Sequence, residues 1–182
     1  MVALAGPFIV IAALVGVGGA LKVGRPATTA RALAEMGLPS SPALVRAGAA
    51  LEVFVAAGAL AWASRPFAVA VAASYLAFAG FVLAALRRNV ALSSCGCFGV
   101  EDTPPTYGHL ALNLAAVAVA AAVAVAAPHG AALADLGRLD ASLLLRGVFL
   151  VLAAATTWFA YVALTLVPQL LGSDARATTV AP

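Results

Sequence analysis

Long apolar runs, interrupted by short segments that hold most of the charge, dominate this sequence. Residues 2–21 carry no charged side chain at all. Across the chain 64% of residues are hydrophobic and 9% are Asp, Glu, Lys or Arg, against about 25% charged residues in typical soluble domains. Too few polar side chains remain to coat a water-soluble domain, so the sequence predicts an integral membrane protein. The net charge of +3 then concerns loop orientation rather than acidic partners, and nucleic-acid binding is excluded.

The apolar runs divide into five stretches that can each cross a bilayer, a crossing that takes about 20 helical residues. We place these spans at residues 2–21, 42–63, 67–86, 107–127 and 142–171, and we expect residues 172–182 to be a flexible tail. Helices satisfy their own backbone hydrogen bonds in lipid, and the continuous runs lack the alternation of barrel strands. The predicted fold class is therefore all-α, a polytopic membrane helical bundle with residues 1–171 as a single transmembrane domain.

Two features near the first span carry more local predictions. Gly16, Gly18, Gly19 and Ala20 form a stripe of small residues that favours close helix packing. Beyond it, residues 28–36 form a short amphipathic stretch, for which Thr28 or Thr29 is the expected N-cap and Gly37 the expected C-terminal stop.

The connector between the third and fourth predicted spans holds both cysteines of the chain, Cys95 and Cys97, with Gly96 between them. A disulfide across so short a loop needs a tight turn, which glycine permits, and it is expected to be strained. Strained, exposed disulfides tend to be labile or catalytic rather than structural, and a loop this short removes little chain entropy. The pair therefore favours dithiol–disulfide exchange, in which one thiolate attacks a partner disulfide and its neighbour resolves the product.

Two other interpretations of the cysteines remain open at this point. Two thiolates can hold Cu(I) or Zn²⁺ if further ligands join them, and His109 could be a third ligand. Alternatively, the cysteines have a purely structural role.

Several segments together resemble a known family, over roughly residues 1–127. The second span contains Glu52, and the fourth span opens on a polar stretch with His109 and Asn113. The other matching segments are Cys95-Gly96-Cys97-Phe98-Gly99 and, after Lys22, Arg25-Pro26 with the amphipathic stretch to Pro39. This pattern is similar to the methylamine utilisation protein MauE family, within the DoxX-like group of small four-helix membrane proteins.

The resemblance implies a DoxX-like four-helix core, to which residues 142–171 would add a fifth transmembrane helix. It also implies a redox-associated protein that acts with a thioredoxin-like partner in maturing disulfide-containing extracytoplasmic proteins. Methylamine use itself does not follow from it. We consider a quinone as the acceptor of the electrons.

Polar residues within the spans are further candidates for the site. Glu52 lies ten residues after Pro42, and an intramembrane carboxylate is by default a functional hypothesis. It could be protonated, pair with Lys22 or Arg88, or receive protons during thiol oxidation or quinone reduction; a buried hydrogen bond to a neighbouring helix is the alternative. His109 and Asn113 share one helix face, where His109 could lower a thiol pKa, relay a proton, or only cap the helix.

The sidedness of the cysteine connector receives conflicting signals. The positive-inside rule favours the cytoplasm, because more basic residues fall on the connector's side. These are Lys22, Arg25, Arg31, Arg46, Arg87, Arg88 and Arg176, against Arg65, Arg138 and Arg146 on the other. Persistence of disulfides and the family resemblance favour the extracytoplasmic side. We expect a multi-pass protein of the bacterial inner membrane with an extracytoplasmic connector.

Two classes of function follow. The first is a membrane thiol–disulfide redox component, in which Cys95 and Cys97 react, His109 and Glu52 handle protons, and Gly96, Phe98, Gly99 and Asn113 support them. The second is a non-enzymatic scaffold, chaperone or soft-metal binding protein. A transporter is disfavoured, because paired Gly/Pro-interrupted halves are absent.

Overall fold

The computed structural model describes residues 2–62, 64–88, 105–126, 147–148 and 150–163. Its labelled helices are α1 (Val2–Gly24), α2 (Pro26–Glu35), α3 (Pro42–Trp62), α4 (Arg65–Arg88) and α5 (Tyr107–Ala126). α1, α3, α4 and α5 are each long and apolar enough to cross a membrane. The predicted spans at 2–21, 42–63, 67–86 and 107–127 each fall on one of these helices. The described part of the chain is a helical membrane bundle, which confirms the predicted fold class.

Charged and helix-capping residues set the ends of these helices. Ser41 precedes Pro42, and its hydroxyl accepts the backbone N–H of Leu44 at 3.2 Å, so it is the N-cap of α3. α4 ends in Arg87 and Arg88, whose positive charges suit the carbonyl end of a helix. The connector with the cysteines leaves from this end.

α2 differs from the prediction at its start and agrees with it at its end. The helix begins at Pro26 with Arg25 as its N-cap and without a side-chain cap hydrogen bond, so the expected cap at Thr28 or Thr29 is wrong. Pro26 explains the earlier start, because proline is preorganised for the first helical position and needs no capped N–H. Gly37 does stop the helix: its φ is 71°, and the next amide, Leu38 N–H, donates to Leu33 O at 2.9 Å.

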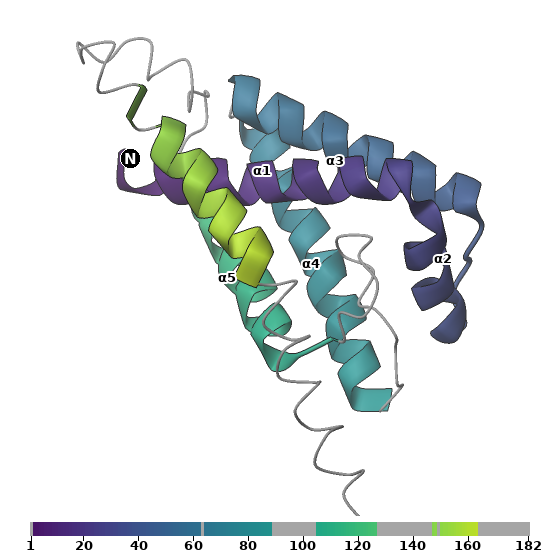
Figure 1. The fold of residues 1–182 in the computed structure, drawn as a ribbon. Coiled ribbons are helices and arrows are strands. Elements are labelled where there is room, and N and C mark those ends of the chain that lie inside the picture. Colours follow the sequence, from purple (N-terminus) through teal and green to yellow (C-terminus); the bar gives the residue numbers. More distant parts are fainter. Residues whose placement is uncertain (1, 63, 89–104, 127–146, 149, 164–182) are drawn as a thin grey trace, which may run out of the picture.

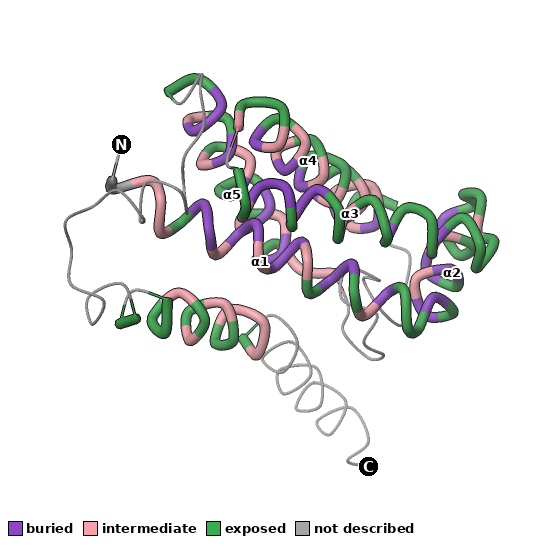
Figure 2. Tube along the Cα trace, turned by 90° about the horizontal axis from the view of Figure 1, so that it is seen from above, coloured by how far each residue is buried: buried purple, intermediate pink, exposed green. Residues whose placement is uncertain are grey.

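The four long helices form two crossing pairs (Figure 1). α1 and α3 lie side by side, and α4 and α5 lie side by side at a steep angle to them. Buried residues line the sides on which the helices meet, and exposed residues face outward (Figure 2). Phe8, Val71 and Val82 are among the most deeply buried side chains. Most of the outward-facing large side chains are apolar, as expected for helices that face lipid.

The α1–α3 contact depends on two of the four predicted small residues, Gly16 and Gly19, whereas Ala20 is exposed. A Cβ added at Gly16 would lie 3.0 Å from Ala56 Cβ, and one added at Gly19 would lie 2.8 Å from the carbonyl oxygen of Ala49. Backbones can approach this closely only where a side chain is missing. α1 and α3 are thereby fixed in register.

The helix Leu150–Ala163 makes up most of the described part of the predicted fifth span, residues 142–171. It is apolar, but it is shorter over the described residues than the four candidate spans. Much of its surface is exposed (Figure 2). The remainder of that span and the tail 172–182 lie outside the described residues, so a fifth crossing stays a prediction.

Candidate functional site

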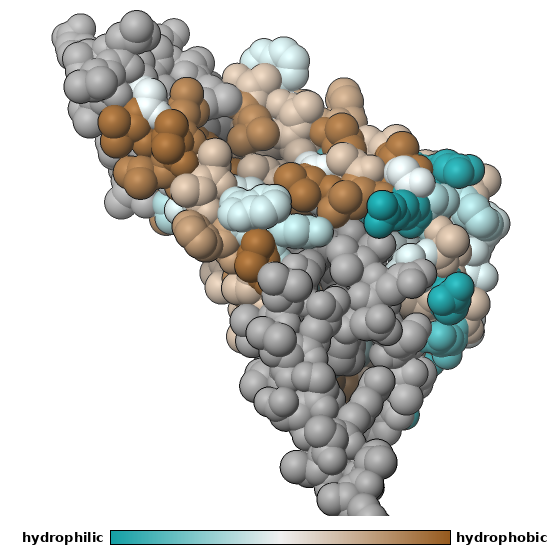
Figure 3. Space-filling view, viewed as in Figure 1, coloured by the Kyte–Doolittle hydropathy of each residue, from teal (hydrophilic) through white to brown (hydrophobic). Residues whose placement is uncertain are grey.

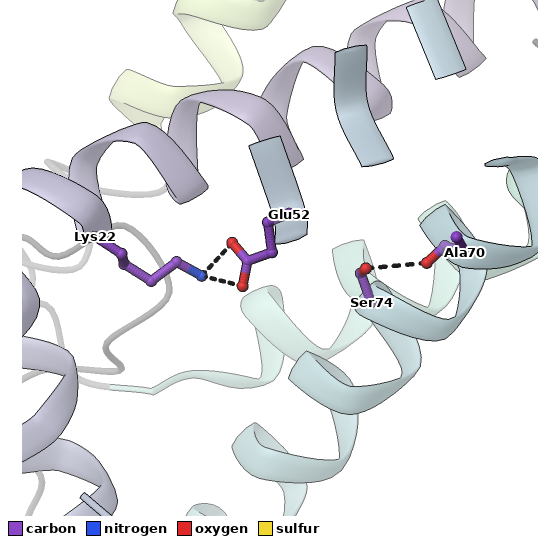
Figure 4. A network of polar contacts seen from close by, with 4 residues as sticks. All are labelled: Lys22, Glu52, Ala70 and Ser74. Atoms are coloured by element: carbon purple, nitrogen blue, oxygen red, sulfur yellow. Dashed lines mark hydrogen bonds and ion pairs between the residues drawn. The ribbon is translucent and has the colours of Figure 1, made fainter. Parts of the chain in front are cut away.

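A buried ion pair between α1 and α3 is the most distinctive polar feature of the bundle (Figure 4). Lys22 Nζ lies 2.6 Å from Glu52 Oε1, to which it donates a hydrogen bond, and 2.5 Å from Oε2. The Lys22 side chain is 5% exposed and the Glu52 side chain 16%. Of the partners expected for Glu52, the structure therefore selects Lys22. Arg88 instead donates to the carbonyl oxygen of Met36 at 3.3 Å.

The close packing of α1 on α3 explains why these two residues meet. A Cβ at Gly19 would lie 3.0 Å from Glu52 Cβ, so the α1 backbone rests directly against the carboxylate-bearing turn of α3. Lys22 follows Gly19 by three residues and shares its helix face. Its long side chain then reaches the carboxylate from one turn further along α1.

α4 supports the lysine through aromatic rings. Lys22 Nζ lies 4.7 Å from the centre of the Phe78 ring, within cation–π range. Phe78 meets Tyr75 edge to face, with 5.9 Å between ring centres. The Tyr75 hydroxyl donates to the carbonyl oxygen of Ile11 on α1 at 2.8 Å. The ion pair is thus built from α1 and α3 and held in place by α4.

A cavity of about 520 Å³ lies beside the ion pair. Lys22 and Glu52 line it, together with mostly apolar residues of α2, α3 and α4, and Arg88 borders it at the end of α4. Its volume is within the range of small-molecule sites. Because Arg88 is the last residue of α4, the cavity lies at the end of the bundle from which the cysteine connector departs.

The molecular surface changes character along the bundle (Figure 3). Hydrophobic surface covers much of the described face, whereas hydrophilic residues gather toward α2 and the start of α3. Arg25, Arg31, Glu35 and Arg46 are exposed in that region. This end of the bundle therefore has the composition of a membrane boundary.

His109 is buried in the first turn of α5, directly after the cysteine connector. Thr106 Oγ1 accepts the backbone N–H of His109 at 3.3 Å and lies 2.8 Å from His109 Nδ1. A neutral imidazole protonated at Nε2 fits this arrangement, because the hydroxyl can then donate its proton to Nδ1. Thr106 is thus the N-cap of α5, and it also orients the histidine ring.

His109 and Asn113, which the sequence places on one helix face, are both buried on α5. Asn113 is 6% exposed and lies one turn beyond His109, which is 3% exposed. Glu52 belongs to a different part of the bundle, since α3 packs chiefly against α1 whereas α5 packs chiefly against α4. The structure therefore joins Glu52 to Lys22 and places His109 with Asn113.

The predicted cysteine site lies outside the described residues. This applies to Cys95, Gly96, Cys97, Phe98 and Gly99. The described helices fix its two anchors, the end of α4 at Arg88 and the start of α5 at Tyr107. Among the described residues, no three His, Cys, Asp or Glu side chains come together as a metal site would need.

Sequence reasoning missed Thr106 and Phe78, which contact His109 and Lys22. Thr106 could have been found, because threonine immediately before an apolar helix is a common N-cap. Phe78 could not, because nothing distinguishes it from the other apolar residues of α4 until Lys22 is placed over its ring.

Four apolar helices, two of which are joined by an ion pair, and a connector between two spans fit a multi-pass helical membrane protein. Its family follows from the sequence: the model of the family described as methylamine utilisation protein MauE matches residues 1–127. The chain belongs to this family, and the match covers α1 to α5. No curated protein and no solved structure gave a significant match to the chain.

Proposed function

We propose that the protein is a membrane component of thiol–disulfide exchange whose reactive groups are Cys95 and Cys97. The observation that carries this proposal is the position of the chain's two cysteines, which are separated by a single residue in the connector between α4 and α5. Both of these helices are candidate membrane spans, so the connector belongs at a membrane boundary, where a soluble partner can reach it. Membership of the MauE family supports the same proposal.

The exchange transfers a disulfide without any other oxidant or reductant. A thiolate of one cysteine attacks the partner's disulfide and forms a mixed disulfide, and the partner's first sulfur leaves as a thiolate. The second cysteine then attacks the mixed disulfide, so that Cys95 and Cys97 are joined and the partner is released as a dithiol. The reverse sequence oxidises the partner.

His109 can accept and donate a proton, and it lies in the first turn of α5, which follows the cysteine connector. In the tautomer protonated at Nε2, the ring can release a proton from Nε2 and take one up at Nδ1, which lies 2.8 Å from the Thr106 hydroxyl. We expect the partner to be a thioredoxin-like protein, and the clients to be disulfide-containing extracytoplasmic proteins of the pathway after which the family is named.

A trapping experiment tests the exchange. In a Cys97→Ala variant the mixed disulfide at Cys95 cannot be resolved, so a covalent partner should accumulate and be identified by mass spectrometry. A Ser94→Ala variant is the matched control, because it changes the neighbouring residue and keeps both thiols. A Cys95→Ala variant tests the other thiol in the same way. If neither of these single-cysteine variants captures a protein with a reactive dithiol, the proposal is wrong.

The side of the membrane is tested separately. We infer that the connector faces the extracytoplasmic side of a bacterial inner membrane, and an impermeant thiol reagent should then label Cys95 and Cys97 on intact cells. Two variants in a background without native cysteines serve as references. Ala34→Cys on α2 should be labelled on intact cells, as the connector is, whereas Ser64→Cys at the opposite end of α3 should not be labelled. If only Ser64→Cys is labelled on intact cells, the orientation is the opposite of the one inferred here.

A further inference from the structure

We propose that the cavity beside the Lys22–Glu52 pair is a binding site for the head of a membrane quinone or quinol. It holds about 520 Å³ and is bounded by three candidate membrane spans, α1, α3 and α4, together with α2. A ligand of this site would therefore come from the lipid phase and be largely apolar.

The room in the cavity comes from small residues on facing helices. Gly48 on α3 and Gly80 on α4 both line it, and a Cβ added at either would meet nothing within 4 Å. Ala49, Ala77 and Ala84 contribute further short side chains to the walls. Phe78 and Phe81 add aromatic surface against which a flat ring can pack.

The ion pair supplies the polar groups that a quinone and its reduced form require. A quinone carbonyl accepts a hydrogen bond and a quinol hydroxyl donates one. The Lys22 ammonium offers donors, and the Glu52 carboxylate has more acceptor positions than one lysine fills. The pair is neutral as a whole, which suits an uncharged head group better than an anionic one. A lipid acyl chain would offer the ion pair no further hydrogen bond.

The position of the cavity gives the ligand a role that rests on the proposed thiol–disulfide function. Arg88 borders the cavity, and Cys95 follows it by seven residues, a length of chain that spans at most about 25 Å. Cys95 and Cys97 as a dithiol would give two electrons and two protons to the quinone. An S–S bond forms and the quinone becomes a quinol, with Glu52 as a proton acceptor and donor beside the ring.

Saturation binding of decylubiquinone to the full-length protein in nanodiscs tests the site directly. We expect saturable binding, and binding at least about tenfold weaker in Glu52→Gln and in Gly80→Phe, whose new ring would fill the cavity. Val69→Phe is the matched control, because it adds a ring to an exposed position of the same helix and should bind like the wild type. Gly48→Leu fills the cavity from α3 and replaces Gly80→Phe if that variant does not fold.

Quinone binding can be tested independently of the thiol–disulfide exchange. The Cys95→Ser, Cys97→Ser double variant should bind decylubiquinone with unchanged affinity, since the cavity contains neither cysteine. Retained binding in both cavity-filling variants would overturn the proposal. So would the absence of saturable binding, or complete displacement by oleic acid at equal concentration, which would identify the cavity as a lipid-chain site.

Discussion

Glycine has opposite effects on packing at the two ends of the contact between α3 and α4. At the end near the α3–α4 turn, Gly58 lets the Phe67 ring pack directly on the α3 backbone, and Trp62 stacks on the same ring with 6.1 Å between centres. At the other end, Gly48 and Gly80 leave the space of the cavity, with the buried ion pair beside it. One end is sealed by aromatic packing, and the other keeps room and polar groups. The candidate functional groups therefore lie at the open end, from which the cysteine connector also leaves.

The largest effect is expected from Lys22→Met at the open end. Removing the ammonium leaves the Glu52 carboxylate buried without its charged partner, which should lower the free energy of unfolding by about 3 kcal/mol. Adding Glu52→Gln should recover much of this loss, because no charge then remains buried. Denaturant titration in bicelles measures both, with Arg46→Met as an exposed control. Equal stability of Lys22→Met and wild type would contradict the pairing.

The next effect concerns the sealed end. Gly58→Ala places a Cβ inside the space of the Phe67 ring, and the resulting displacement should cost about 2 kcal/mol. The same substitution should cost little in a Phe67→Ala background, where the ring is absent. A double-mutant cycle of thermal unfolding measures this coupling, and additive effects would show that the two residues do not share the contact.

A smaller effect is expected at Tyr75, between the two ends. Tyr75→Phe removes the hydrogen bond to the carbonyl oxygen of Ile11 and keeps the ring against Phe78, so the loss should be about 1 kcal/mol. Tyr107→Phe removes an exposed hydroxyl and should have no effect on stability. Equal unfolding midpoints for the two variants would argue against the Tyr75 contact.

The smallest effects are expected from alanine substitutions of the two cavity glycines. Gly48→Ala and Gly80→Ala add a methyl group to open space, and alanine is the better helix former. Each should raise the free energy of unfolding by about 0.5 kcal/mol, opposite in sign to Gly58→Ala. Clear destabilisation by either would mean that the open end is packed more tightly than the structure shows.

The helices could be predicted from the sequence because charge and proline mark their ends. Arg87 and Arg88 close α4, Ser41 and Pro42 open α3, and Gly37 ends α2. The predicted N-cap of α2 was wrong, because Thr28 is also a common capping residue and lies only two residues after Pro26, where the helix begins.

The sequence predicted individual residues of the candidate site but not which of them lie in contact. Glu52 is conspicuous as a carboxylate in an apolar run, but helix periodicity does not fix the register between two helices. The choice of Lys22 over Arg88 therefore needed the contact at Gly19. The cavity depends on Gly48 and Gly80 facing the same space from different helices, which no local pattern encodes.

Cys95 and Cys97 should alternate between dithiol and disulfide, which a redox titration of the purified protein can measure. The protein is equilibrated in glutathione buffers of graded potential, free thiols are alkylated, and the mass of the peptide with both cysteines is measured. We expect one two-electron transition, from two alkylated thiols to one intramolecular disulfide. Two free thiols at every potential would contradict the claim.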